Sequence, residues 1–290
     1  MGLRGPVLVA TNLSEAADRA LAEGYAAARA LKAPFVVCHV LPEAFRIRML
    51  FPHAAGIDKT AQAALEEKAA AAVRARLDEV VGRGHEASLQ FESGSPHAGI
   101  LEIAARIDAG VIVMGPGRTA QRVARSAQCP VLVARPALDG GGVLGATDFS
   151  DPSLPAVRMA ADEAARRGVP LRLLHCLGVD ETAYLAVAAM PDAVALPPLS
   201  EDAIEQLEAS ARERLRDALA TAGATGEAVV TRRSPGAGIV EAIQASPTSL
   251  VVVGTHGRTG LRRLALGSVA EDILGHAPCS VLVVPIRPEA

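Results

Sequence analysis

The chain has 290 residues, enough for two domains of about 150 residues each. Half of the residues are hydrophobic, 21% are charged and 2% are aromatic, a composition typical of a globular protein. Its net charge of −3 and its lack of Trp argue against nucleic-acid binding, because such proteins need basic surfaces and aromatic rings on which bases stack. No apolar run reaches the roughly 18 residues of a membrane span, and the first residues pass into a strand pattern rather than a cleavage site, so we expect a cytoplasmic protein without membrane contact.

In the first half of the chain, short apolar runs alternate with longer helical patterns, as in the βαβ units of a parallel sheet. VLVATN from Val7 and FVVCHVL from Phe35 are its first two predicted strands. His39 in the second strand, like His175 in the corresponding strand of the second half, is expected to pack at the edge of the core rather than to act in catalysis.

The pattern of the first half then occurs a second time. VLVATNLSEAADRAL from Val7 recurs as VLGATDFSDPSLPAV from Val143, and SPHAGILEIA from Ser95 recurs as SPGAGIVEAI from Ser234. Self-similarity of this kind indicates tandem copies of one structural unit. We therefore expect an α/β protein built from two repeats of the same fold.

A linker separates the two repeats. PALDGGG at 136–142 has the proline and glycine content of such a segment, which predicts one domain at 1–137 and another at 142–290. In the second domain we predict strands near 143–147, 170–176, 227–232, 249–253 and 280–284.

Each repeat also contains one long helical pattern, at 59–84 and at 200–223, with apolar residues at helical spacing and charges on the other faces. The connections that precede these helices, at 43–60 and 178–200, are unusually apolar. We expect them to pack within the chain, while covering a ligand or binding a partner are the alternatives.

The fourth apolar run of the second repeat leads into GTHGRTGLRRLALGS, from Gly254 to Ser268. Its glycines let a ligand approach the backbone without meeting a Cβ. Ser268, followed three residues later by Glu271, is a capping box and predicts that Ser268 is the N-cap of the last helix. Such a helix end presents free N–H groups and the positive end of a dipole, which favour a phosphate. The loop adds positive charge through Arg258, Arg262 and Arg263.

An acidic residue stands at the other end of this candidate site. Asp148 follows the first strand of the second repeat, at the same carboxyl edge of the sheet as Gly254. Ligands of open α/β sheets bind at this edge, where the winding direction reverses. A carboxylate there can bind a ribose hydroxyl or an adenine amine while the glycine loop wraps phosphates, so the sequence predicts a nucleotide site.

Both repeats resemble universal stress protein domains, over nearly the whole chain. Nucleotide-binding members of that family carry G-x-x-G-x9-G-[ST], which the second repeat matches in full at Gly254, Gly257, Gly267 and Ser268. The resemblance implies a Rossmann-like, adenine nucleotide alpha hydrolase-like fold, with five parallel strands in the order 3-2-1-4-5 and helices on both faces. It also implies that ATP, with Mg on its phosphates, binds at Ala146, Thr147, Asp148, Cys176, Gly254, His256, Gly257, Arg258, Gly267, Ser268 and Val269.

Within this set the resemblance implies a division of roles. Asp148 and the backbone near Cys176 contact the adenosine end, and main-chain N–H groups near Gly257, Ser268 and Val269 hold the phosphates. His256 either reaches a phosphate or is solvated. No residue is assigned to catalysis or to direct metal binding.

The first repeat departs from the family pattern. In MGPGRTAQRV, Gly115 corresponds to Gly254 and Gly117 to Gly267, but Pro116 alone replaces the intervening loop and Arg118 replaces Ser268. Asn12 stands where the second repeat has an acid. We therefore expect that the first domain does not bind ATP in the family manner.

Three other interpretations of these glycine motifs are weaker. GPGRTA fits the dinucleotide pattern G-x-G-x-x-A, but the next strand ends without an acidic residue and closes its repeat. No G-x-x-x-x-G-K-[ST] is present, which excludes the P-loop class. A turn chosen only for geometry needs about 2–6 residues, far fewer than lie between Gly254 and Ser268.

The sequence therefore favours an ATP-binding regulatory or stress-response module that signals to an unknown protein partner. A slow ATPase or nucleotide-transferring enzyme is the first alternative, although no acid–base pair or activated nucleophile accompanies the loop. A nucleotide-free scaffold is the second alternative.

Family members commonly dimerise through the last strand, so CPVLVA at 129–134 is expected to pair with CSVLVV at 279–284 as a pseudo-dimer within the chain. Whether homodimers also form stays open.

The four cysteines, none of them in a C-x-x-C pair, are expected to be buried reduced thiols: Cys38, Cys129, Cys176 and Cys279.

Overall fold

The computed structural model describes residues 3–41, 59–136, 140–180, 199–255 and 266–286. The chain divides into two compact units, an amino-terminal one at Leu3–Pro136 and a carboxyl-terminal one at Ala137–Ala290. No helix in the described parts of the chain is long and apolar enough to cross a membrane.

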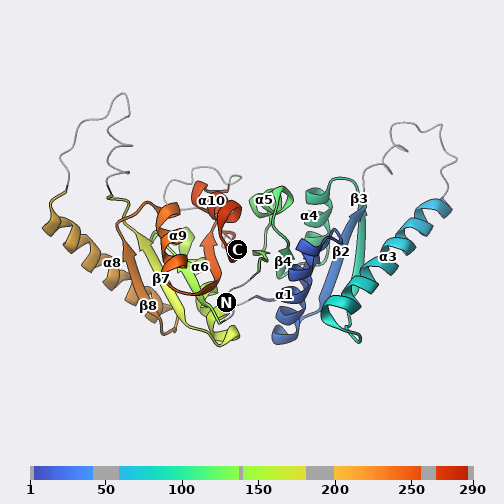
Figure 1. The fold of residues 1–290 in the computed structure, drawn as a ribbon, viewed down its shortest axis with the longest axis horizontal. Helices are drawn as coiled ribbons and strands as arrows, with labels where there is room; N and C mark the ends of the chain where they lie inside the picture. The colour runs from blue at the N-terminus through green and yellow to red at the C-terminus, as the bar shows by residue number, and fades with distance from the viewer. Residues whose placement is uncertain (1–2, 42–58, 137–139, 181–198, 256–265, 287–290) are drawn as a thin grey trace, which may run out of the picture. The chain divides into compact units, whose positions relative to one another are not determined.

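The amino-terminal unit, blue to green in Figure 1, is a parallel sheet in the order β3-β2-β1-β4-β5. This is the strand order that the family resemblance implies. Its elements are β1 (Val7–Ala10), α1 (Glu15–Leu31), β2 (Phe35–Leu41), α3 (Lys59–Val81), β3 (Ser88–Ser93), α4 (Pro96–Arg106), β4 (Val111–Met114), α5 (Arg118–Ser126) and β5 (Val131–Val133).

The carboxyl-terminal unit, yellow-green to red in Figure 1, repeats the arrangement as β8-β7-β6-β9-β10. All five strands predicted in this repeat are present, and both strand orders confirm the expected fold class. Its elements are β6 (Gly142–Ala146), the 3-10 turn η2 (Asp151–Ser153), α6 (Leu154–Arg167), β7 (Leu171–Cys176), α8 (Glu201–Thr221), β8 (Glu227–Thr231), α9 (Pro235–Ala245), β9 (Thr248–Gly254), α10 (Ser268–His276) and β10 (Ser280–Val284).

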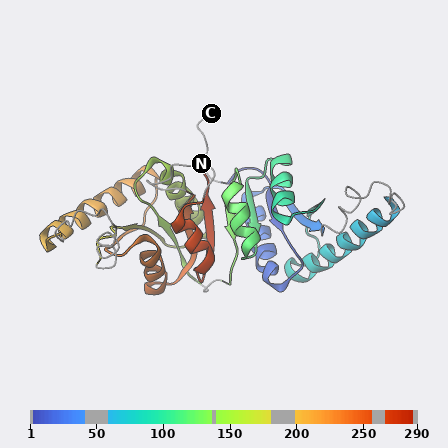
Figure 2. The same cartoon turned by 90° about the horizontal axis from the view of Figure 1, so that it is seen from above.

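The central strands are continuous apolar runs because helices cover both faces of each sheet. Every residue of β1 and β4 is buried, and in β9 only the terminal Gly254 is partly exposed. Figure 2 shows helices on the two sides of each sheet; α1 lies against α3 and α4 against α5, and α6 lies against α8 and α9 against α10. Right-handed crossovers require this switch of face where the chain reverses direction across the sheet. The reversal falls between β1 and β4 and between β6 and β9.

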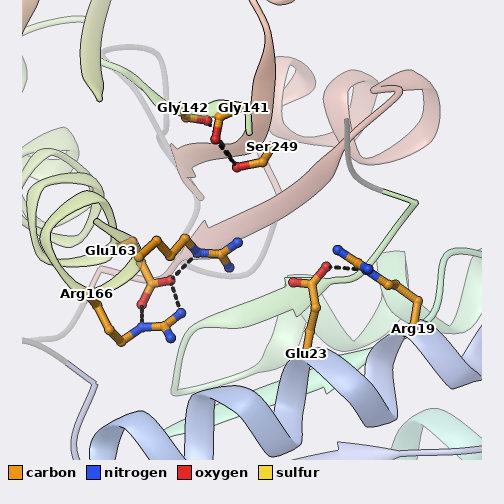
Figure 3. A network of polar contacts seen from close by, with 8 residues as sticks. Arg19, Glu23, Gly141, Gly142, Glu163, Arg166 and Ser249 are labelled. Atoms are coloured by element: carbon orange, nitrogen blue, oxygen red, sulfur yellow. Dashed lines mark hydrogen bonds and ion pairs between the residues drawn. The ribbon is translucent and has the colours of Figure 1, made fainter. Parts of the chain in front are cut away.

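Two groups of polar contacts secure the carboxyl-terminal unit near its core (Figure 3). The Ser249 hydroxyl donates to the carbonyl of Gly141 at 2.7 Å and so attaches the start of β6 to β9. Glu163, only 3% exposed, accepts from Arg166 Nε at 2.8 Å and from Arg167 Nε at 3.1 Å. Burial opposes ionisation of this carboxyl, but the hydrogen bonds and charges of the two arginines outweigh it and hold the pKa of Glu163 below its usual value.

Candidate functional site

A cavity of about 240 Å³ lies at the carboxyl edge of the second sheet, between β6 and β9, where the winding direction reverses. Its walls also come from the end of β7 and from the first turns of α9 and α10. Eight of the predicted site residues line it: Ala146, Thr147, Asp148, Cys176, Gly254, Gly267, Ser268 and Val269.

The rest of the predicted loop, including His256, Gly257 and Arg258, lies outside the described residues. So do 42–58 and 181–198, which make up most of the two apolar connections. These predictions stay predictions.

A tight turn after β6 positions the acidic residue. Asp148 Oδ1 accepts from the Ser150 backbone N–H at 3.0 Å and from its hydroxyl. Beneath it, Thr147 Oγ1 and Ser153 Oγ lie 2.8 Å apart, both in nearly fully buried residues, and the Ser153 hydroxyl reaches the Ser150 carbonyl at 2.8 Å. Because these bonds determine the path of the turn, they hold the half-buried Asp148 carboxylate at the wall of the cavity.

His175 belongs to this wall and not only to the core edge. Its Nδ1 lies 2.8 Å from the Thr147 carbonyl, which can only accept, so in the neutral ring Nδ1 carries the proton and Nε2 is the acceptor. The ring lies against Phe149 at a centroid distance of 4.2 Å, and the Arg214 guanidinium covers Phe149 at 4.2 Å from its centroid. These contacts fix the orientation of the imidazole.

Cys176 also lines the cavity. Burial raises its pKa to about 12, and the charge of Glu241 adds to the rise. All four cysteines are free, as expected; Cys38, Cys129 and Cys279 are buried, whereas Cys176 is partly exposed.

The two ends of the glycine loop are held together at the base of the cavity. The Gly267 N–H donates to the Thr255 carbonyl at 2.7 Å, and the Thr255 N–H donates to Val284 on β10 at 3.0 Å. Thr255 and Gly267, the described residues on the two sides of the loop, therefore lie together at the base of the cavity, beside the phosphate-binding end predicted for this site.

The predicted N-cap of α10 is wrong by one residue. Gly267 is the N-cap, with φ −63° and ψ 149°, because its carbonyl accepts the first helical bond from the Glu271 N–H at 2.9 Å. Ser268 is the first residue inside the helix, and with Glu271 one position too late the capping box does not form. Gly267 has no side chain with which to cap α10, and the first-turn N–H groups of Ser268, Val269 and Ala270, which have no helical partners, lie at the cavity wall.

Several wall residues were not predicted from the sequence. Pro235 and Ile239 belong to the repeated SPGAGIVEAI segment, and Ser153 to the first repeated segment, so the repeat itself was the signal that could have found them. The remaining ones are apolar or backbone neighbours of predicted residues: Leu174, Val253, Thr255 and Ala270.

The described part of the site offers one carboxylate, one imidazole, hydroxyl groups and a helix N-terminus. Among the described residues, no cluster of three or more His, Cys, Asp and Glu side chains is arranged to hold a metal ion. The arrangement suits a ligand with hydroxyl or amine donors at one end and negative charge at the other.

The model of the universal stress protein family matches residues 4–135 and again 142–285. Universal stress protein Rv2623 of Mycobacterium tuberculosis is 29% identical over 232 residues, which cover 71% of this chain and 74% of that protein. A universal stress protein of Thermus aquaticus is 30% identical over 143 residues, 49% of this chain and 96% of that protein. The crystal structure of a universal stress protein from Archaeoglobus fulgidus covers 97% of this chain and 96% of its own, with a TM-score of 0.68 at 17% identity, a likeness of fold.

Proposed function

The chain belongs to the universal stress protein family, with two family domains in tandem, and we propose that its carboxyl-terminal domain binds ATP and signals its occupancy to a protein partner. The observation that supports this most strongly is the cavity between β6 and β9, which combines Asp148, the uncapped first turn of α10 and the closed base of the glycine loop. Each of these features suits a different part of one nucleotide.

The adenosine end of ATP is assigned to the β6 and β7 side of the cavity. Asp148 supplies an acceptor for ribose hydroxyls or the adenine amine, and Leu174, Ile239 and Val253 supply apolar surface for the base. This side offers acceptors and apolar contacts, which match a nucleoside better than a phosphate.

The phosphates are assigned to the α10 side. The first-turn N–H groups of Ser268, Val269 and Ala270, which have no helical partners, and the positive end of the helix dipole favour negative charge there. The motif residues Gly257 and Arg258 are proposed to complete the phosphate contacts. Magnesium would be held chiefly by phosphate oxygens, its usual arrangement in nucleotide sites.

Calorimetric titration of the nucleotide-stripped protein with magnesium ATP tests the proposal. We expect one site per chain, and weaker binding in D148A but not in the matched variant N12A. Two other universal stress proteins have been solved in complex with cAMP and with dAMP, so both ligands belong in the competition series. No binding of any adenine nucleotide, or equal losses in both variants, would refute the site.

The signalling part of the proposal needs a second measurement. Sedimentation of the chain with and without magnesium ATP tests whether homodimers form and whether the nucleotide changes their association, while the protein partner and the pairing of 129–134 with 279–284 stay predictions. A change in association on nucleotide addition supports a regulatory role, whereas steady phosphate release without one would favour the enzyme.

A further inference from the structure

The amino-terminal domain has a cavity in the position that corresponds to the candidate nucleotide site. It has a volume of about 230 Å³ and opens between the carboxyl ends of β1 and β4, where the strand order reverses. The loop after β4 consists only of Gly115, Pro116 and Gly117, yet this cavity is nearly as large as the one in the other domain. Loss of the long loop has therefore changed the chemistry of the site without closing it.

The first chemical difference concerns the residue after the first strand. Asn12 forms the same turn as Asp148, with Oδ1 accepting from the Ser14 N–H at 3.1 Å and from the Ser14 hydroxyl at 2.6 Å. Because an N–H can donate only to the amide oxygen, these bonds identify the other terminal atom as the Nδ2 amino group. The amino-terminal domain thus has a hydrogen-bond donor where Asp148 has a carboxylate oxygen.

The second difference lies at the start of α5. Gly117 is the N-cap, at φ 138°, and has no side chain with which to cap the helix. The N–H groups of Arg118, Thr119 and Ala120 consequently lack helical partners, and all three residues line the cavity. Arg118 stands where the other domain has Ser268, and no carboxylate in the described ranges pairs with its guanidinium.

The remaining wall determines the charge and shape of a suitable ligand. None of the described residues around the cavity is Asp or Glu, so the ionised side chain at its wall, Arg118, is positive. Val40, Ile100 and Met114 supply apolar surface. The described wall of the carboxyl-terminal cavity has the reverse composition, with Asp148 and without Arg or Lys.

We propose that the amino-terminal cavity binds a small organic anion other than a nucleotide. Its carboxylate or phosphate head group lies at the first turn of α5, where it accepts from backbone N–H groups, Asn12 Nδ2 and Arg118. Its apolar body packs on Ile100 and Met114. A ribose is disfavoured because no carboxylate accepts from its hydroxyls. The inference concerns a separate cavity and does not depend on ATP binding in the other domain.

Methyl NMR of the full chain with labelled isoleucine tests this proposal, because Ile100 lines this cavity and Ile239 lines the other. The two-part probes are phenyl phosphate and benzoate, each of which has an anionic head group and an aromatic ring. The controls are phenol, which lacks the anionic group, and inorganic phosphate, which lacks the ring. We expect a two-part probe to shift Ile100, to leave Ile239 unmoved, and to bind at least about tenfold more tightly than phenol or phosphate. The preferred two-part probe identifies the head group. No shift of Ile100, or equal affinity for phenol, would refute the proposal.

Two variants test the assigned contacts. N12D keeps the oxygen that Ser14 requires but adds a negative charge at the head-group position, and R118Q removes the cation. Each should weaken the better probe by about tenfold or more, while D148N, the matched change in the other domain, should not. Unchanged methyl signals of Ile103 and Ile112, which are fully buried in the amino-terminal domain, confirm that the variants fold. Unchanged affinity in N12D, or magnesium ATP shifting Ile100 as strongly as Ile239, would overturn the proposal.

Discussion

Replacing Asp148 by Asn isolates the contribution of one atom to nucleotide binding. Asp148 Oδ1 accepts both bonds from Ser150, and an amide oxygen can accept the same two bonds, so the turn should survive. The variant therefore changes the second terminal atom from a charged acceptor to a donor. A hydrogen bond to a charged group contributes about 1.5–3 kcal/mol, so the Kd for magnesium ATP should rise by about 10- to 150-fold.

The partner of that atom can be identified with nucleotide analogues in the same calorimetric assay. If the carboxylate accepts from the ribose, D148N should weaken ATP strongly but leave 2′,3′-dideoxy-ATP almost unchanged, because the analogue has already lost the donors. If it accepts from the adenine amine, inosine triphosphate should be the insensitive ligand. An equal loss for all three ligands, or an unchanged Kd for ATP, would refute the assignment of Asp148 to the adenosine end.

N12D is the control for this experiment. It places a carboxylate at the equivalent turn of the other domain, where the long loop is missing. It should change neither the Kd nor the stoichiometry of ATP binding.

The other predictions concern stability and reactivity. Ionised Glu163 should stabilise the fold above about pH 4.5, and this contribution should be lost as the pH falls through its lowered native pKa. In urea unfolding, E163Q should therefore lose less unfolding free energy on acidification than the parent protein. Identical pH profiles for the two proteins would contradict the assignment. Gly117→Ala should lower the free energy of unfolding by about 1–2 kcal/mol because φ is 138° at this position. Gly267→Ala, at φ −63°, should lower it by less than about 0.5 kcal/mol in the absence of nucleotide. Equal losses in denaturant melts would show that backbone conformation is not the reason why position 117 requires glycine. With its pKa raised to about 12, Cys176 should react with iodoacetamide at pH 8 far more slowly than a peptide thiol, and peptide-like labelling would show that it is not desolvated.

Local patterns were sufficient to predict most of the elements. All five strands of the second repeat were predicted. The runs at β6 and β9 are largely apolar because central parallel strands are buried on both faces and cannot alternate, whereas β8, at the edge of its sheet, is partly exposed. The N-cap of α10 was predicted wrongly, because the capping box is a pattern of residue types. The carbonyl that starts the helix depends on how Gly267 enters it from its bond to Thr255.

The residues of the site were predicted less completely than the strands. His175 looked like a core residue because its sequence context is a strand end, and only the packing of several elements around the cavity shows that it belongs to the wall. The same holds for Ile239, which comes from α9. Such residues meet because parallel strands bring distant segments to one edge, which no local window of sequence records.

By itself, the sequence determined that the protein consists of two α/β repeats of the universal stress protein type and that only the second has the complete glycine motif, because periodicity, self-similarity and motif spacing are local properties. The tertiary structure alone decided which side chains share a cavity, that α10 begins uncapped after Gly267, and that the first domain keeps a cavity although its loop is missing. The reason is that a cavity is bounded by the packing of several elements, so the shape of the sheet edge preserves it when one connection is shortened.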